Sequence, residues 1–206
     1  MRVALFIDEA NLYFSQRTLK WEIDFERLYK YFDERFAMYN SFFYAPEPPD
    51  EEEEKKKSYQ QLSLLGYTLR LKKLKEIRGK SGEVVAKKAN LDIEMAIDMF
   101  ATKDHYDIAI MFTGDSDFVR AVELLRMHGK QIFVFSTKGH SSLEIINAAD
   151  KFIDYKDLRH EFEKKKPEKV LEEKPEKVSG ELASKPARRR GNRGPKPSGN
   201  TSPEAQ

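Results

Sequence analysis

The chain has 206 residues, which is enough for one sizeable domain followed by a tail. Its 37 lysine and arginine residues nearly balance its 35 aspartate and glutamate residues, but residues 164–206 contain 12 basic and 6 acidic residues, so a basic tail follows an acidic body. Cysteine is absent, which excludes disulfides, cysteine-ligated zinc, iron–sulfur clusters and thiol catalysis, and favours the reducing cytoplasm as the location.

The N-terminal part of the chain alternates short apolar runs with amphipathic stretches. Strands are expected at residues 2–7, 41–45 and 67–74. The last of them should have one wet face, because apolar and polar residues alternate along it. Helices are expected at residues 24–36 and 50–65, from helical spacing in the first and from an acidic start followed by lysines in the second. Because Asp8 and Glu9 interrupt the first apolar run, we expect no signal peptide, anchor or membrane contact.

The same alternation continues after a polar loop that we expect at residues 77–88. Helices are expected at residues 90–102, 116–128, 141–149 and 157–165. Strands are expected at residues 107–112, 131–135 and 152–155. The pattern predicts an α/β domain over residues 1–163, with a mainly parallel central sheet covered by helices on both faces.

The end of the chain differs in composition from this domain. Every Trp, Tyr and Phe lies before residue 163, and 6 of the 9 prolines lie in residues 166–206. We therefore predict that residues 164–206 form a disordered tail rich in Lys, Arg and Pro. A basic tail of this kind either attracts nucleic acid or only keeps the protein in solution.

Acidic residues follow two of the expected strands at the point where each strand ends. Asp8 comes directly after the first strand, and Asp115 and Asp117 follow residues 107–112 in the segment TGDSDF. If the two strands are neighbours, the three carboxylates converge at the carboxyl edge of the sheet. Such carboxylates repel each other, and Mg²⁺ or Mn²⁺ relieves the repulsion and can activate a water for phosphodiester hydrolysis.

Each of these residues also has a purely local use. Asp8 is suited to a turn, Asp115 to a helix N-cap, and Asn11 to a hydrogen bond within its own turn. In the helix expected at residues 90–102, Asp92, Glu94 and Asp98 cannot all face one cleft. Asp92 lies near the helix start, where it either reaches a neighbouring cleft or only complements the helix dipole.

Basic and aromatic residues could bind a substrate near this edge of the sheet. The basic residues around the expected loop are Arg70, Lys72, Lys73, Lys75, Arg78, Lys80, Lys87 and Lys88. They could follow a phosphate backbone, or they could form an ordinary solvated surface. Tyr13, Phe14 and Trp21 could stack on bases, although such residues more often pack in a core.

Three segments, FIDEANLY, LDIEMAID and TGDSDFVRAVELLRMHGKQIFVF, occur in this order and resemble the NYN family, also called LabA-like, of the PIN-like nuclease superfamily. The resemblance covers nearly all of residues 1–157. It implies a Rossmann-like PIN-type fold and a Mg²⁺- or Mn²⁺-dependent ribonuclease, in which a metal-activated water hydrolyses RNA without a covalent intermediate. The family often has Lys-Gly-Val-Asp where this chain has Lys88-Ala89-Asn90-Leu91-Asp92, so the acidic position is kept and the glycine is not.

The resemblance also implies roles for individual residues. The acidic, metal-binding and catalytic cluster would be Asp8, Asp92, Asp115 and Asp117, with Asp98 in a supporting role. Asn11 would orient Asp8 or contact the substrate, and Thr113 and Ser116 would offer a hydroxyl to metal-bound water or to phosphate. From the basic loop before Asp92, Lys87 and Lys88 are added as candidate substrate contacts.

Two other functions compete with a nuclease. A haloacid-dehalogenase-type phosphatase also pairs a first-strand Asp with a later Gly-Asp segment, but it expects a second Asp where this chain has Ala10. A non-catalytic RNA-binding or regulatory protein of the same fold is the other alternative. A dinucleotide enzyme is disfavoured because no G-x-G-x-x-G follows the first strand. Apolar surface on such small domains often pairs, so a homodimer is also an open expectation.

Overall fold

Strands and helices alternate through residues 1–79 and 81–165, the part of the chain that the computed structural model describes. The strands are β1 (Arg2–Asp8), β2 (Ala37–Pro46), β3 (Tyr67–Lys72), β4 (Lys75–Arg78), β5 (Val84–Lys88), β6 (Ile108–Phe112), β7 (Gln131–Ser136) and β8 (Lys151–Asp154). The helices are α1 (Glu9–Leu19), α2 (Phe25–Asp33), α3 (Glu53–Leu64), α4 (Asp92–Ala101), α5 (Val119–Met127), α6 (Leu143–Ala148) and α7 (Arg159–Phe162). The predicted tail lies outside the described residues, apart from residues 164 and 165.

The central sheet has six strands in the order β3-β2-β1-β6-β7-β8, and every neighbouring pair is parallel. The chain builds the sheet outward from β1 to β3 on one side, and then from β6 to β8 on the other. The strand order therefore reverses between β1 and β6, where ligands bind in open α/β sheets. The predicted parallel α/β fold is confirmed, and β1 and β6 are neighbours, as convergence of their carboxyl ends requires.

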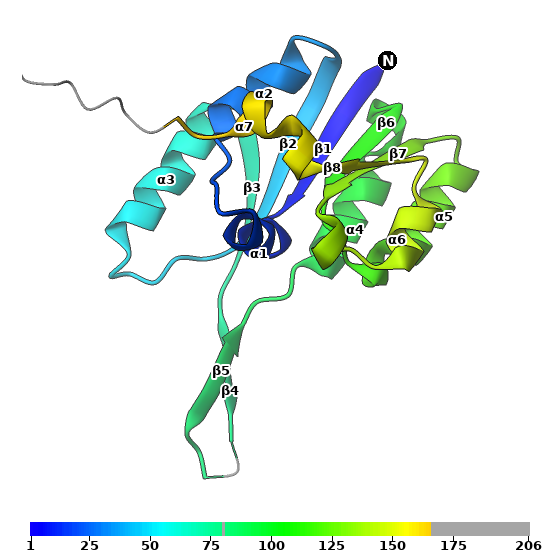
Figure 1. The fold of residues 1–206 in the computed structure, drawn as a ribbon. Helices are drawn as coiled ribbons and strands as arrows, with labels where there is room; N and C mark the ends of the chain where they lie inside the picture. The colour runs from blue at the N-terminus through cyan, green and yellow to red at the C-terminus, as the bar shows by residue number, and fades with distance from the viewer. Residues whose placement is uncertain (80, 166–206) are drawn as a thin grey trace, which may run out of the picture. The chain divides into compact units, whose positions relative to one another are not determined.

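Helices cover both faces of the sheet, as predicted (Figure 1). On one face, Val3, Leu5 and Ile7 of β1 pack in a buried cluster that includes residues of α1, α2, α3 and α7. On the other face, Ala4 and Phe6 pack with residues of α4, α5 and α6. This alternation follows from the two-residue period of a strand, so β1 is buried on both sides along almost its whole length.

The first correction concerns the residues after β1, which the sequence places in a turn and which form helix α1. The helical period was hidden because Leu12 and Ser15 are the buried residues of α1, while the neighbouring Tyr13 and Phe14 point to solvent. The helix begins at Asp8, whose side chain accepts hydrogen bonds from the Ala10 and Asn11 amides.

The second correction concerns the polar loop expected at residues 77–88, which contains most of the antiparallel hairpin β4–β5. The hairpin projects beyond the carboxyl end of the six-stranded sheet (Figure 1). Since it lies outside the layers of the core, it shows none of the apolar alternation that reveals a half-buried strand. Among residues 1–79 and 81–165, none of the helices combines the length and apolar character that a membrane span requires.

Candidate functional site

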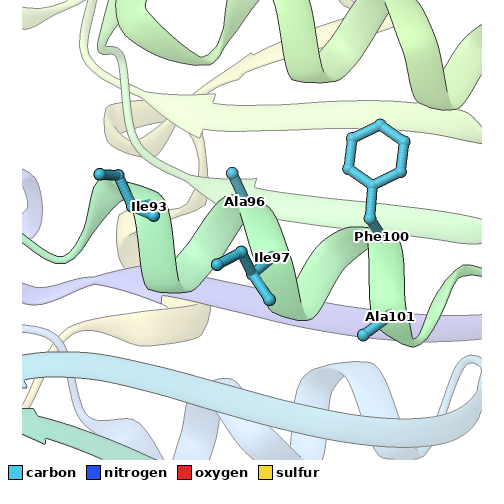
Figure 2. Close-up of a pocket in the computed structure, with 5 residues that line it drawn as sticks. All are labelled: Ile93, Ala96, Ile97, Phe100 and Ala101. Carbon is cyan, nitrogen blue, oxygen red and sulfur yellow. The ribbon is translucent and has the colours of Figure 1, made fainter.

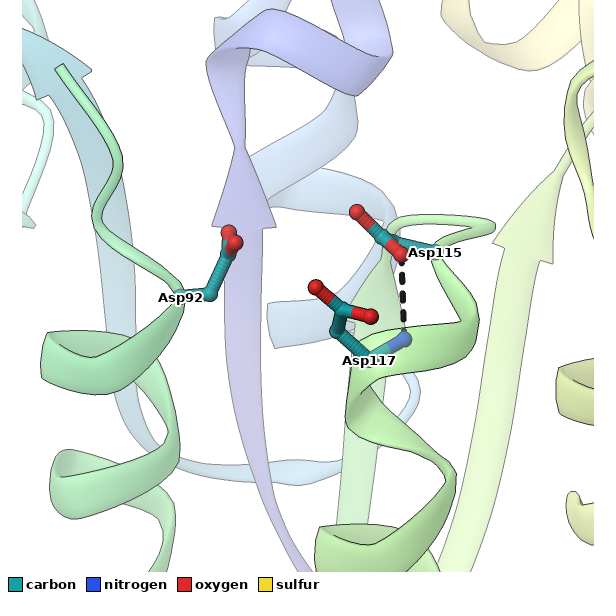
Figure 3. A group of neighbouring side chains, drawn as sticks. All are labelled: Asp92, Asp115 and Asp117. Atoms are coloured by element: carbon teal, nitrogen blue, oxygen red, sulfur yellow. Dashed lines mark hydrogen bonds between the residues drawn. The ribbon is translucent and has the colours of Figure 1, made fainter.

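Three carboxylates meet at the carboxyl edge of the sheet, beside the end of β1 (Figure 3). Asp92 begins α4, Asp115 lies in the loop after β6, and Asp117 lies in the short 3-10 helix Ser116–Phe118. Each contributes an oxygen atom that lies within 4.8 Å of the oxygens from the other two. Asp92 and Asp115 are half-buried and Asp117 is exposed, so the group lies at the rim of the fold and is open to solvent on one side.

Asp8 lies next to this group and shares a hydrogen-bond network with it. The Thr113 hydroxyl donates to Asp8 Oδ2 at 3.2 Å, and the Asp115 amide donates to Thr113 Oγ1 at 3.3 Å. Thr113 follows directly after β6, whose residue Phe112 is in register with Ile7, so it lies beside Asp8. Burial raises the pKa of Asp8 to about 6, and the Asp92 charge also raises it, while the amides of Asn11 and Ala10 and the Thr113 hydroxyl lower it.

The loop that carries Asp115 is held by a close backbone approach at Gly114. A Cβ atom at this position would lie 2.5 Å from the carbonyl oxygen of His140, so glycine is the residue that fits. The Ser142 amide donates to the Gly114 carbonyl at 3.0 Å, which ties the loop after β6 to the loop after β7. The Asp117 amide donates to Asp115 Oδ1 at 3.0 Å, and this bond sets the start of the short helix.

Asp92 is positioned by the residue two places before it. The Asn90 side chain accepts a hydrogen bond from the Asp92 amide at 2.9 Å, which forms a local turn just before α4. Lys72, at the end of β3, donates to the Asn90 carbonyl at 2.8 Å and to Glu94 Oε1 at 2.6 Å. Asn90 is not among the predicted site residues, although Asn is a residue that typically forms such local turns.

Asp98 is separate from the three carboxylates and is neutralised within the fold. Arg70 donates through Nε to Asp98 Oδ2 at 2.8 Å, and the Tyr44 hydroxyl donates to the same oxygen at 3.1 Å. The hydrogen bond with Asp98 raises the pKa of Arg70, and burial together with the Asp98 charge raises that of Tyr44. These contacts tie the middle of α4 to β2 and β3, the strands that carry Tyr44 and Arg70.

The remaining predicted site residues lie around the same edge. The Asn11 amide donates to Asp8 Oδ1 at 3.3 Å, and its side-chain oxygen accepts from the Ser136 hydroxyl at 3.4 Å. Ser116 is exposed and lies between Asp115 and Asp117 in the chain. The backbones of Lys87 and Lys88 lie in β5, in register with Glu76 and Lys75, whereas their side chains lie outside the described part of the structure.

The donor set fits a hard divalent cation. Carboxylate oxygens are the ligands that Mg²⁺ and Mn²⁺ prefer, and the group contains neither histidine nor cysteine. Within the described part of the chain, none of the ion pairs involves Asp115 or Asp117. Two neighbouring carboxylates without a cationic partner favour the binding of a cation from solution.

A shallow apolar pocket occupies a different side of α4 (Figure 2). It is lined by Ile93, Ala96, Ile97, Phe100 and Ala101. Ile93 and Ile97 are 69% and 59% exposed. Since apolar side chains line this pocket, it offers no ligand for a metal or a phosphate.

Comparisons with known proteins give the family model that the chain matches and the proteins that it resembles. The model of the NYN domain family matches residues 2–159. Over 168 residues the chain is 40% identical to the "Low amplitude and bright protein LabA" of Synechococcus elongatus, covering 79% of this chain and 88% of that protein. A crystal structure of a protein of unknown function from Vibrio parahaemolyticus is similar in fold, with a TM-score of 0.65, 21% sequence identity, and coverage of 79% of this chain and 96% of that one.

Proposed function

This chain belongs to the NYN domain family, and from that membership we propose that it is a ribonuclease that hydrolyses RNA phosphodiester bonds with the help of Mg²⁺ or Mn²⁺. The observation that carries the proposal is the group of three carboxylates, Asp92, Asp115 and Asp117, gathered at the point where the strand order of the sheet reverses. Such a group is costly to assemble without a cation, because like charges close together disfavour each other.

Asp92, Asp115 and Asp117 would hold the metal, with Asp8 as the fourth carboxylate of the site. A bound Mg²⁺ or Mn²⁺ supplies a water of lowered pKa and offsets the negative charge that develops on the phosphate. Asp8 is half-buried and accepts hydrogen bonds from three donors, so its carboxylate is held in a fixed orientation.

We assign the residues around the carboxylates to positioning and to substrate contact. Thr113 is completely buried and bridges Asp8 to the Asp115 amide, so it acts as a positioning residue. Asn11 lies between Asp8 and Ser136 and would either orient Asp8 or contact the RNA. Ser116 contributes a hydroxyl at the rim, and Asp98 supports the site by fixing α4 through Arg70.

Parts of the chain beyond the carboxylates would serve binding. Lys87 and Lys88 lie in the hairpin strand that leads to Asp92, and we propose that they approach the phosphate backbone. A contact of residues 164–206 with nucleic acid rests on their arginines and lysines. If the protein forms a homodimer, we propose that the exposed apolar side of α4 is the interface. The proposal of a cytoplasmic location rests on the absence of cysteine.

The test is cleavage of end-labelled single-stranded and structured RNA by the purified full chain, with Mg²⁺, with Mn²⁺ and with EDTA. We expect cleavage with either metal, none with EDTA, and a loss of at least about 100-fold in Asp115→Asn. Asp104→Asn is the matched control, because Asp104 is an exposed carboxylate next to Lys103 at the opposite end of β6. It should cleave as the wild type does.

Three outcomes would overturn the nuclease proposal. Equal cleavage by Asp115→Asn and wild type would mean a contaminating nuclease or a different site. RNA retention without cleavage would leave the non-catalytic RNA-binding protein. Release of phosphate from p-nitrophenyl phosphate, abolished by Asp8→Asn, would point to the phosphatase.

A further inference from the structure

Helix α1 exposes two adjacent aromatic rings that the core does not use. The side chains of Tyr13 and Phe14 are 49% and 56% exposed. Their rings meet edge to face, with centroids 5.6 Å apart. Arg17, one turn further along the helix, lies with its guanidinium carbon 5.7 Å from the centre of the Tyr13 ring.

The exposure of these rings is not a failure of packing. Leu12 and Ser15 fill the inner side of α1, and they are completely or almost completely buried. Trp21, the third aromatic residue that the sequence offered as a stacking residue, is 7% exposed and belongs to the core. Trp21 thus serves the core, whereas Tyr13 and Phe14 keep about half of their side-chain surface accessible to a ligand.

The two rings lie close to the carboxylates along the chain and along the helix axis. The helix starts at Asp8, so at about 1.5 Å per residue the rings lie roughly 7–9 Å further along its axis. Successive nucleotides in a stacked strand are separated by about 3.4 Å, so that distance equals roughly two to three nucleotide steps. Along the helix axis, a strand with one phosphate at Asp8 therefore reaches the level of the rings within roughly two to three nucleotides.

We propose that Tyr13 and Phe14 form a stacking platform for unpaired bases, which makes single-stranded RNA the substrate class of the site. The inference rests on the proposed ribonuclease function for its choice of nucleic acid. An aromatic ring stacks on any base, so the platform binds without reading sequence. Bases in a duplex are already stacked and paired, so they cannot reach these rings.

The chemistry of the platform favours RNA over a protein partner. Arg17 places a cation beside the rings, where it can pair with a phosphate or stack with a base. On the outer side of α4, by contrast, a patch lined by apolar residues offers no charge for a nucleic acid. The two exposed surfaces thus differ in the ligand that each can recognise.

The experiment measures RNA binding separately from cleavage. In the full chain carrying Asp115→Asn, with Mg²⁺ present, fluorescence anisotropy gives the affinity for labelled oligouridine, for the same oligonucleotide with abasic riboses, and for a blunt RNA duplex. We expect Tyr13→Ala and Phe14→Ala each to weaken oligouridine binding about tenfold. Binding of the abasic oligonucleotide and of the duplex should change less than about twofold in these variants.

Two variants separate stacking from general damage to the protein. Phe14→Trp keeps an aromatic face and should bind oligouridine at least as well as the parent. Tyr39→Ala removes a partly exposed ring near the amino end of β2, where it stacks on His105, and should leave RNA binding unchanged. Thermal unfolding of each variant checks that the exposed positions tolerate the changes.

The inference would be overturned if Tyr13→Ala and Phe14→Ala bound oligouridine like the parent, or lost duplex binding by the same factor. It would also be overturned if these variants left RNA binding intact and abolished self-association in sedimentation, since the rings would then belong to a protein interface. If the wild type never cleaves RNA but binds it through the two rings, only the nuclease proposal is wrong. If the protein cleaves RNA with metal and neither ring substitution changes RNA binding or cleavage, only the stacking platform is wrong.

Discussion

The tripeptide Phe-Ile-Asp occurs twice in this chain, at the end of β1 and at the end of β8. In both places the aspartate ends a strand and caps the helical turn that follows. Asp8 accepts hydrogen bonds from the Ala10 and Asn11 amides, and Asp154 accepts one from the Lys156 amide at 3.2 Å. The local sequence thus produces the same cap twice, as the propensities of a strand-end aspartate predict.

The neighbours of the two aspartates are different. β1 lies inside the sheet between β2 and β6, and Asp8 has Thr113 as a partner and the charge of Asp92 nearby. β8 is the edge strand, and Asp154 has the ammonium group of Lys156 at 3.6 Å. The residue type at a strand end therefore sets the cap, whereas the position of the strand in the sheet decides whether carboxylates gather there.

The largest difference between the two positions should appear in RNA cleavage. Asp8→Asn keeps the shape and the amide-accepting oxygen of the side chain but removes the charge, so we expect cleavage to fall about 100- to 1,000-fold. Asp154→Asn makes the same chemical change at the edge of the sheet and should cleave RNA as fast as the wild type. Single-turnover cleavage of labelled RNA in Mg²⁺ measures both.

Equal losses in the two variants would show that a strand-end aspartate serves only folding, and would remove Asp8 from the site. Circular dichroism and gel filtration of both proteins would establish that neither loss comes from unfolding.

The second prediction concerns stability, where the same substitution should act in the opposite direction. Because burial raises the pKa of Asp8 from 3.8 to about 6, the folded state binds the Asp8 proton more tightly than the unfolded state does. The Asp8 contribution is therefore most favourable below pH 4, falls as the pH rises from 4 to 6, and stays constant above 6. Two pKa units correspond to about 3 kcal/mol.

Above pH 6, Asp8→Asn should accordingly be more stable than the wild type by roughly 2 kcal/mol. The gain is smaller than about 3 kcal/mol because the asparagine gives up part of the Thr113 hydrogen bond. Below pH 4 the advantage should vanish. Urea unfolding of both proteins in EDTA, across this pH range, measures the difference. A difference that does not change with pH would mean that ionisation of buried Asp8 carries no cost in the folded protein.

Much of the fold follows from the sequence, because the strands of the sheet are short apolar runs, α2 shows a periodic apolar side, and α3 has an acidic start followed by lysines. Helix α1 and the β4–β5 hairpin were not predicted, and the cause is the same for both. Neither sequence shows apolar residues spaced to form one buried face. In α1 the exposed rings of Tyr13 and Phe14 break the amphipathic pattern, and in the β4–β5 hairpin the core takes no part.

The candidate site could be predicted only in part. Strand ends place Asp8, Asp115 and Asp117 at one edge once β1 and β6 are known to be neighbours, but the spacing within α4 left the place of Asp92 open. The bond from the Asp92 amide to the Asn90 side chain is local and could have been predicted from the sequence. The role of Gly114 depends on His140, which lies far along the chain, so no local pattern reveals it.

A third prediction tests that long-range contact. Gly114→Ala places a methyl group 2.5 Å from the His140 carbonyl, so one of the two loops must move, and we expect a loss of about 1–2 kcal/mol in stability. The displaced loop carries Asp115, so RNA cleavage should fall as well. Gly139→Ala is the matched control, because a Cβ there meets no atom within 4 Å, and it should change stability by less than about 0.5 kcal/mol. If both variants unfold at the same urea concentration, the close approach at Gly114 does not constrain the site.

The smallest change in stability is expected for substitutions of Asp154 at the edge of the sheet. These substitutions measure what a strand-end aspartate contributes when no other carboxylate is nearby. Asp154→Ala removes the oxygen that accepts the Lys156 amide, so unfolding in urea should show a loss of about 1 kcal/mol. Asp154→Asn keeps an acceptor and should lose only a few tenths, because the ion pair with Lys156 involves a lysine side chain that is 58% exposed. If the asparagine variant lost as much as the alanine variant, the charge and not the cap would be what Asp154 contributes. The contrast with Asp8 would then lie in the cation that each aspartate has, which is a lysine of the chain at β8 and, under the proposed function, a metal from solution at β1.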